Sequence, residues 1–320
     1  MIEIVRAHDL DLPRNVDKFR QLVHVLDGDP FTYTNFLSKF KTLRFMYQSP
    51  ELIKRITREA IADAAADNVR YMELRFTPVA LTRIKDFPLS EAMDWVIESV
   101  EEASEEYGVI TSLIATVNRH ESLDLAEEVV KLAVDRKDKG IISLDLTGNE
   151  ADFPGVEFEG VFKEAKQSGL RITIHAGEWG GPENIELAIN KLGAERIGHG
   201  VRVLEDPKVV DLTRERKITF EVCPTSNYQS GVFSSIEEHA LPKMIDQGLI
   251  VTLNTDDPAI SQIDLSDEYE LACEFFGFDI TSLQKIILRA AQSSFLPNER
   301  HKELIASLKK EFKENNNEIA

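Results

Sequence analysis

Three short segments place histidines and carboxylates where they could hold a metal ion. "TIHAGEW" contains His175 and Glu178, and "RIGHGV" contains His199 between two glycines. "LNTDDPAI" contains Asp256 and Asp257, adjacent carboxylates that repel each other unless a cation or a donor lies between them. Imidazole and carboxylate ligands together suit zinc, which keeps one position for water in catalytic sites. The chemistry indicated is attack by a metal-activated water molecule.

Two further features fit such a site. Glu178 is not needed as a ligand and could instead transfer protons. Gly148, in "LDLTGNE", offers a backbone without a side chain, and the glycines around His199 also allow close approach.

Each of these residues also has an ordinary structural explanation. A lone histidine can be a hydrogen-bonded core residue, and Asp256-Asp257 before Pro258 can start a turn. Gly148 can be a loop residue, and Glu178 can be a solvated surface charge. Their occurrence together, at the same end of several strands, favours the functional interpretation.

Seven segments rich in aliphatic and β-branched residues predict strands. Most are continuous apolar runs, which is typical of strands covered on both faces. The predicted strands are residues 71–78, 110–119, 141–148, 171–178, 196–201, 218–224 and 250–258.

Helical patterns alternate with these strands. Residues 49–67 begin with Ser49 as the expected N-cap and Pro50 at the first helical position, and similar patterns end at Gly108 and Gly140. Alternating strands and helices predict an α/β fold with a parallel sheet. The sequence has no Gly-rich turn after its first strand, so it does not support an open, doubly wound dinucleotide-binding sheet. The polar residues follow the carboxyl ends of several strands, which is typical of a barrel, so we expect a (β/α)8 TIM-type barrel.

Bulk properties exclude several classes of protein. The chain has 320 residues, with 37 basic and 56 acidic side chains and a net charge of −19. This charge disfavours nucleic acid and anionic membranes as partners and is compatible with a small-molecule substrate. Two cysteines without a CxxC pair, no apolar run long enough for a membrane helix and no signal peptide predict a cytoplasmic protein. The sequence does not indicate an oligomeric state.

Taken together, these motifs resemble the adenosine deaminase family of metal-dependent hydrolases. The resemblance rests on "HAGE", "RIGHGV", "EVCPTSN" and "NTDDP" in this order, with support from "MELRFTP", "LDLTGNE" and "SSFLPNERHKEL". It covers residues 1–312, which we expect to form a single domain, followed by a flexible tail over 313–320. The resemblance implies one Zn²⁺ per subunit and hydrolysis of adenosine, together with 2′-deoxyadenosine, to inosine and ammonia.

The resemblance also implies roles for individual residues. His175 and Asp256 resemble zinc ligands. Glu178 resembles the proton donor to purine N1, and His199 resembles the residue that orients and deprotonates the attacking water. Asp257 resembles the hydrogen-bond partner of purine N7. Gly148 resembles the residue whose backbone contacts purine N3.

The chain departs from the family at its beginning. The family's first strand carries a His-x-His-Leu-Asp-Gly motif whose two histidines are zinc ligands. "LVHVLDGDP" has only His24, with no apolar strand before it, so we interpret His24 as a surface or helix-end residue and "DGDP" as a turn. His8 is a similar case. We expect the first strand to be missing through N-terminal truncation, and this chain to bind zinc poorly and turn over little.

The sequence is also compatible with other functions. An adenine deaminase of the same family is the nearest alternative, while the absence of a Lys or Arg cluster at the strand ends disfavours phosphorylated substrates. A non-catalytic purine-binding or partner-binding barrel is an alternative from another class. A hydrolase acting on a different cyclic amidine is a third.

Overall fold

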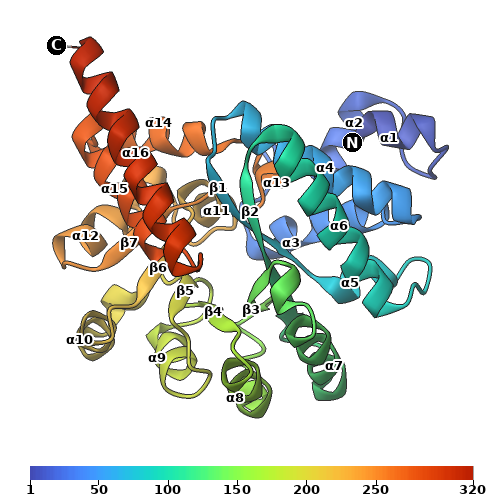
Figure 1. Cartoon of the computed structure of the whole chain (residues 1–320), viewed down its shortest axis with the longest axis horizontal. Coiled ribbons are helices and arrows are strands. Elements are labelled where there is room, and N and C mark those ends of the chain that lie inside the picture. Colours follow the sequence, from blue (N-terminus) through green and yellow to red (C-terminus); the bar gives the residue numbers. More distant parts are fainter. Residues whose placement is uncertain (320) are drawn as a thin grey trace.

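A curved sheet of seven parallel strands forms the centre of the molecule (Figure 1). The computed structural model describes residues 1–319, with side chains through residue 314. The strands pair in chain order, from β1 at one edge to β7 at the other. Their bounds are β1 Tyr71–Phe76, β2 Ile110–Asn118, β3 Ile141–Thr147, β4 Arg171–Ala176, β5 Arg196–His199, β6 Thr219–Val222 and β7 Ile250–Leu253.

Helices follow the strands and surround the sheet, as expected for a TIM-type (β/α) fold (Figure 1). Those before and beside the first strands are α1 Ile2–Ala7, α2 Val16–Val23, α3 Tyr33–Arg44, α4 Pro50–Ala66, α5 Pro78–Thr82, α6 Leu89–Tyr107, α7 Leu123–Val134 and α8 Glu159–Gln167. The remaining helices are α9 Pro182–Asn190, α10 Pro207–Glu215, α11 Pro224–Gln229, α12 Leu241–Asp246, α13 Pro258–Ser261, α14 Leu265–Phe276, α15 Ile280–Ser293 and α16 Asn298–Ile319.

The seven predicted strands are all present, but each ends earlier than predicted. The sequence pattern extends through Glu178 and Pro258, whereas β4 ends at Ala176 and β7 at Leu253. The polar residues after these strands therefore lie in loops, where they are free to turn toward the site. The helix predicted to reach Gly140 ends at Val134, because the following charged segment has no apolar face, and Gly140 instead ends a short 3-10 turn.

Two kinds of side chain alternate along the strands. Leu144, Leu146, Ile172 and Ile174 belong to the apolar core that packs against the helices. The alternate positions carry buried polar groups, among them Asp145. Because successive side chains of a strand point to opposite faces, the concave face of this sheet is polar.

The ends of the chain are helical. Residues before β1 form α1 to α4, and α4 corresponds to the helix predicted over residues 49–67. Ser49 caps α4 by accepting a hydrogen bond from the backbone of Leu52. Residues 313–319, where the sequence suggests a flexible tail, continue the backbone of α16, and residue 320 lies outside the described residues. Within the described part of the chain, no helix is both long and apolar enough to cross a membrane.

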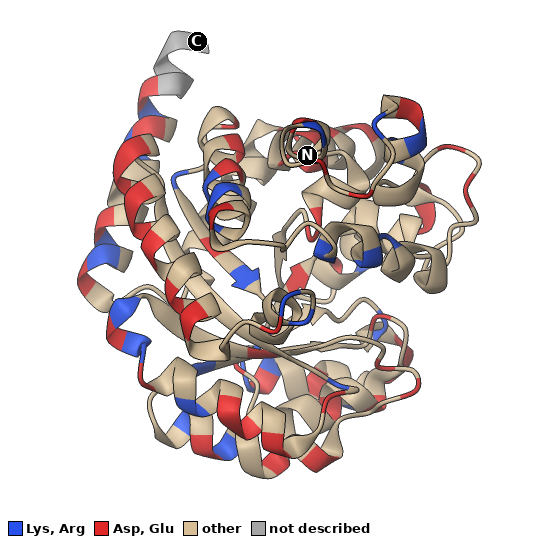
Figure 2. Cartoon of the chain, turned by 90° about the vertical axis from the view of Figure 1, so that its right-hand side faces the viewer, with Lys and Arg blue, Asp and Glu red and all other residues tan. Residues whose placement is uncertain are grey.

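Acidic residues outnumber basic ones along the helices, and the basic residues are scattered among them (Figure 2). This distribution matches the net charge of −19. The surface therefore offers little attraction to polyanions in general.

Candidate metal and active site

His175, His199 and Asp256 come together at the carboxyl ends of the strands. One ligand atom from each residue lies within 4.8 Å of the others. The two imidazole rings meet edge to face, with centroids 5.1 Å apart. Nitrogen and carboxylate donors at this spacing fit a divalent metal of the zinc type, and within the described residues they form the one such cluster identified.

A buried carboxylate orients His175. The Nδ1 atom of His175 lies 2.9 Å from Oδ2 of Asp145, which is fully buried on β3. With Nδ1 held in this way, Nε2 remains the atom available to a metal, which is the usual arrangement around a ligating histidine. Gly198 allows the ring to lie there, because a Cβ at position 198 would be 3.0 Å from Nδ1 of His175.

Asp145 belongs to a chain of buried charges across the concave face. Nε of Arg75 lies 2.8 Å from Oδ2 of Asp145, and the same guanidinium pairs with Glu221. Glu221 in turn lies 2.7 Å from Nε of Arg196. The two arginines lower the pKa of Glu221 to about 2, so this carboxylate stays charged. The chain of ion pairs fixes the base of the site.

Glu178 lies in the loop after β4 and is buried. Burial, followed by the neighbouring charges of Asp256 and Glu150, raises its pKa well above the usual value. Glu150 also accepts hydrogen bonds from the backbone N–H groups of residues 177–179, which fixes the loop. A protonated carboxylic acid held in a rigid loop can donate a proton to a ligand.

His199 ends β5 with a backbone φ of 60°. This left-handed conformation is uncommon outside glycine and turns the side chain out of the regular strand direction. Burial lowers the pKa of His199 to about 4, so the ring is neutral near pH 7. A neutral imidazole can accept a proton.

Hydrogen bonds through Asn227 link His239 to His199 and Glu178. The backbone N–H of Leu241 donates to Nδ1 of His239, so Nε2 of His239 donates to Oδ1 of Asn227 at 3.3 Å. Nδ2 of Asn227 donates to Oε1 of Glu178 at 3.1 Å and also lies 3.1 Å from Nδ1 of His199. Asn227 therefore positions His199 and Glu178 relative to each other.

Asp256 and Asp257 follow β7. Asp256 has a φ of 56°, and one of its carboxylate oxygens accepts a hydrogen bond from Ser226 at 2.7 Å. Burial, and then the charge of Asp256, raise the pKa of Asp257 well above its usual value. The unfavourable pairing of these carboxylates, anticipated from the sequence, is therefore present.

Gly148 follows β3 with a φ of 97°. A Cβ at this position would meet only the backbone of Arg119 and the ring of His120 at ordinary contact distances. The structure thus places Gly148 at the carboxyl ends of the strands, where an added Cβ would meet none of the other five predicted residues within 4 Å.

His24 and His8 lie at helix ends. His24 caps the C-terminus of α2, and its Nδ1 lies 2.6 Å from the backbone oxygen of Ala259. His8 caps α1. "DGDP" forms a turn, as predicted, and neither histidine belongs to the metal cluster.

The N-terminal helices pack beside the candidate site. Tyr33 at the start of α3 contacts Trp179, with ring centroids 5.4 Å apart. Phe31 meets Tyr228 of α11 edge to face at 4.9 Å. These contacts hold α3 close to the loop that carries Glu178.

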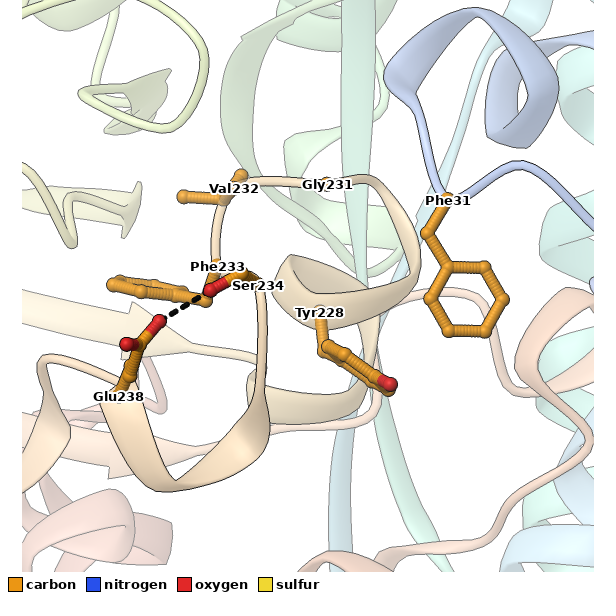
Figure 3. A pocket seen from close by; sticks show the side chains of 7 residues that line it. All are labelled: Phe31, Tyr228, Gly231, Val232, Phe233, Ser234 and Glu238. Carbon is orange, nitrogen blue, oxygen red and sulfur yellow. Dashed lines mark hydrogen bonds between the residues drawn. The ribbon is translucent and has the colours of Figure 1, made fainter.

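A cavity of about 540 Å³ adjoins this contact (Figure 3). Phe31 and Tyr228 form one side, and residues 231–234 and Glu238 form the other. None of the six predicted site residues lines it, so it is separate from the metal cluster.

Sequence reasoning missed the residues that hold the site in place. These are Arg75, Asp145, Glu150, Glu221, Asn227 and His239. Arg75, Asp145 and Glu221 could have been found, because each is a charged residue inside a largely apolar predicted strand. A buried charge of this kind must be paired. Asn227 ends the motif "EVCPTSN", but nothing in the sequence indicates that it links His239 to His199 and Glu178.

The fold and this cluster define a class of protein: a parallel βα-barrel protein with a candidate metal site at the carboxyl ends of its strands. The family model described as adenosine deaminase matches residues 1–311. The chain is 37% identical over 314 residues to an adenosine deaminase of Clostridium botulinum (strain Loch Maree / Type A3), covering 98% of this chain and 92% of that protein. It is 34% identical over 312 residues to an adenosine deaminase of Klebsiella pneumoniae (strain 342), covering 97% and 93%.

Solved structures with the same fold include deaminases of adenine and of N6-methyl-AMP. The adenine deaminase from Arthrobacter aurescens superposes with a TM-score of 0.88 at 27% identity, covering 97% of this chain and 93% of that one. The N6-methyl-AMP deaminase from Arabidopsis thaliana gives 0.83 at 26% identity, covering 97% and 91%. The chain belongs to the adenosine deaminase family, whose members are hydrolases of C–N bonds.

Proposed function

We propose that this chain hydrolyses adenosine, and 2′-deoxyadenosine, to inosine and ammonia. The observation that carries the proposal is the position of Glu178, a buried acid of raised pKa, beside His199 and the metal cluster. Identities of 34–37% to adenosine deaminases over nearly the whole chain support the same substrate. The two free cysteines are in keeping with a cytoplasmic location.

His175 and Asp256 are the residues that we propose as zinc ligands. Their donor atoms suit zinc, and the contact from Asp145 leaves Nε2 of His175 available. Zinc held there would act as a Lewis acid and lower the pKa of water, which would supply a nucleophile near neutral pH. His175 and Asp256 are two of the four protein ligands that the resemblance implies, so we expect weak zinc binding and slow turnover.

The remaining residues move protons and hold the purine. Glu178 donates a proton to N1, which makes C6 electrophilic. Neutral His199 accepts a proton from the attacking water. The hydroxyl group adds at C6, and His199 then passes its acquired proton to the 6-amino group, which leaves as ammonia. The proton of the added hydroxyl group returns to Glu178, which leaves inosine with an oxygen at C6. Asp257 contacts N7, and the open backbone of Gly148 contacts N3.

The nearest alternative is adenine as substrate, which the similarity to the Arthrobacter aurescens adenine deaminase supports at 27% identity. A nucleoside monophosphate is a second alternative, because Arabidopsis structures of this fold were solved with GMP and with IMP. A purine-binding barrel without catalysis is a third.

A substrate panel separates these functions. Adenosine, adenine and AMP are incubated separately with the full chain and added zinc, and the products are separated by liquid chromatography. We expect inosine from adenosine at a rate at least tenfold above hypoxanthine from adenine or IMP from AMP. Faster conversion of adenine or AMP than of adenosine would show that the proposed substrate is wrong. If adenosine binds but no product forms, the result would support a purine-binding barrel without catalytic activity.

A further inference from the structure

A second cavity lies at the amino ends of the strands, whereas the metal cluster lies at their carboxyl ends. Its volume is about 590 Å³, and its lining includes Arg171, Arg196, Thr219 and Ile250. These are the first residues of β4, β5, β6 and β7, whereas His175 lies near the other end of β4. Because the strands are parallel, this cavity opens at their amino ends, away from the proposed catalytic site.

The lining is cationic in a strongly acidic protein. Four cationic side chains face one carboxylate, that of Glu195. The cations are Arg171, Arg196, Lys217 and Arg289. In a chain with a net charge of −19, such a local excess of positive charge is the reverse of the surrounding surface.

Two of the cations are already held in place. Arg171 pairs with Glu195, 2.7 Å apart, and Arg196 pairs with Glu221. Both guanidinium groups also lie over the ring of Phe295, at 4.4 Å and 3.5 Å from its centroid. The ring and the ion pairs thus fix one wall of the cavity.

The other two cations have no anionic partner among the residues that the structure describes. Arg289 is half-buried on α15 and forms no ion pair there, and Lys217 is exposed after α10. The hydroxyl oxygen of Ser294 is buried in the same lining and has no hydrogen-bond partner in the described structure. A cavity with two unpaired cations and an unpaired hydroxyl lacks one component, an anion that accepts several hydrogen bonds.

We propose that this cavity binds a phosphate group, either as inorganic phosphate or carried by a small phosphorylated metabolite. Arginine and lysine are the usual phosphate ligands, and the hydroxyl of Ser294 adds a neutral donor. The volume suits a small molecule. The lining residues lie at strand starts and on α15, so the site is preformed. The proposal is independent of the deaminase activity.

Calorimetric titration of the full chain tests the site. Inorganic phosphate and ribose 5-phosphate are titrated separately at constant ionic strength, set with sodium chloride. We expect saturable binding of at least one ligand with a stoichiometry of one. Tighter binding of ribose 5-phosphate assigns the site to a phosphorylated metabolite, and equal or weaker binding assigns it to free phosphate.

Variants then locate the binding. The double variant Lys217→Ala/Arg289→Ala removes both unpaired cations without breaking an ion pair, and we expect at least a tenfold loss of affinity. Lys163→Ala, an exposed lysine on α8, is the matched control and keeps the wild-type affinity. Circular dichroism verifies that each variant is folded. Absence of saturable binding of either ligand, or wild-type affinity in the double variant, would overturn the proposal.

Discussion

The carboxylate of Asp145 lies 2.9 Å from Nδ1 of His175, deep at the carboxyl end of the sheet. This contact fixes the ring and its tautomer, so the metal-binding ability of His175 depends on a residue that does not itself reach the metal cluster.

Asp145→Asn tests this dependence. The substitution keeps the shape but replaces a charged acceptor with a neutral one that also leaves Arg75 less well compensated. We expect zinc affinity to fall about 10- to 100-fold, as is usual when the outer partner of a ligating histidine is lost. Zinc titration against a competing chelator measures the change. Asp135→Asn, at an exposed helix end, should leave the affinity unchanged.

Gly198→Ala probes the space behind the His175 ring. The added Cβ would lie 3.0 Å from Nδ1 and 3.1 Å from Cγ of His175, so the ring must move away from Asp145. We expect weaker zinc binding in a protein that remains folded, measured by the same chelator competition. Gly160→Ala in α8, where a Cβ meets no atom within 4 Å, serves as control and should be neutral or stabilising by up to about 1 kcal/mol. Unchanged zinc affinity in Gly198→Ala would contradict the close packing of this ring.

Much of this arrangement could be predicted from the sequence, because strands and loops have local signatures. The seven strands, the site residues His175, Glu178, His199 and Asp256, and the helix-end position of His24 follow from pattern and motif. The strand ends could not be predicted, since apolar runs continue past the last paired residue. The link from Asp145 to His175 joins residues 30 positions apart, and only the register of β3 and β4 brings them together.

Glu178→Gln removes the proposed proton donor. Burial raises the pKa of Glu178 well above its usual value, so the acid form persists to higher pH than in an exposed glutamate and is lost as the pH rises through that pKa. We expect deamination of the wild type to decline on the alkaline side, and the variant to be slower by about 10²- to 10⁴-fold. Rates of ammonia release across pH measure both effects. A Glu178→Gln variant with the wild-type rate and pH profile would exclude Glu178 as the acid.

Glu268 gives the stability a pH dependence of its own. Burial raises its pKa to about 7 from its usual value of 4.5, and the folded state therefore favours the protonated form. The stabilisation is fully present below about pH 4.5 and is lost as the pH rises to about 7. Glu268→Gln should flatten this part of the unfolding profile by about 1–3 kcal/mol.

Urea unfolding at pH 4.5, 6 and 8 measures that change. Glu270→Gln, an exposed position on the same helix, is the control and should follow the wild type. An identical pH profile for Glu268→Gln and wild type would show that Glu268 is charged at no cost in the folded protein.

The most direct test of the account is zinc-dependent ammonia release from adenosine by the full chain. The protein is first stripped with a chelator, and zinc is then added in steps while ammonia and inosine are measured. We predict no turnover in the stripped protein, slow turnover that rises with zinc, and equal amounts of the two products. Turnover that persists unchanged after stripping, or no inosine at any zinc concentration, would contradict the proposed zinc-dependent deamination.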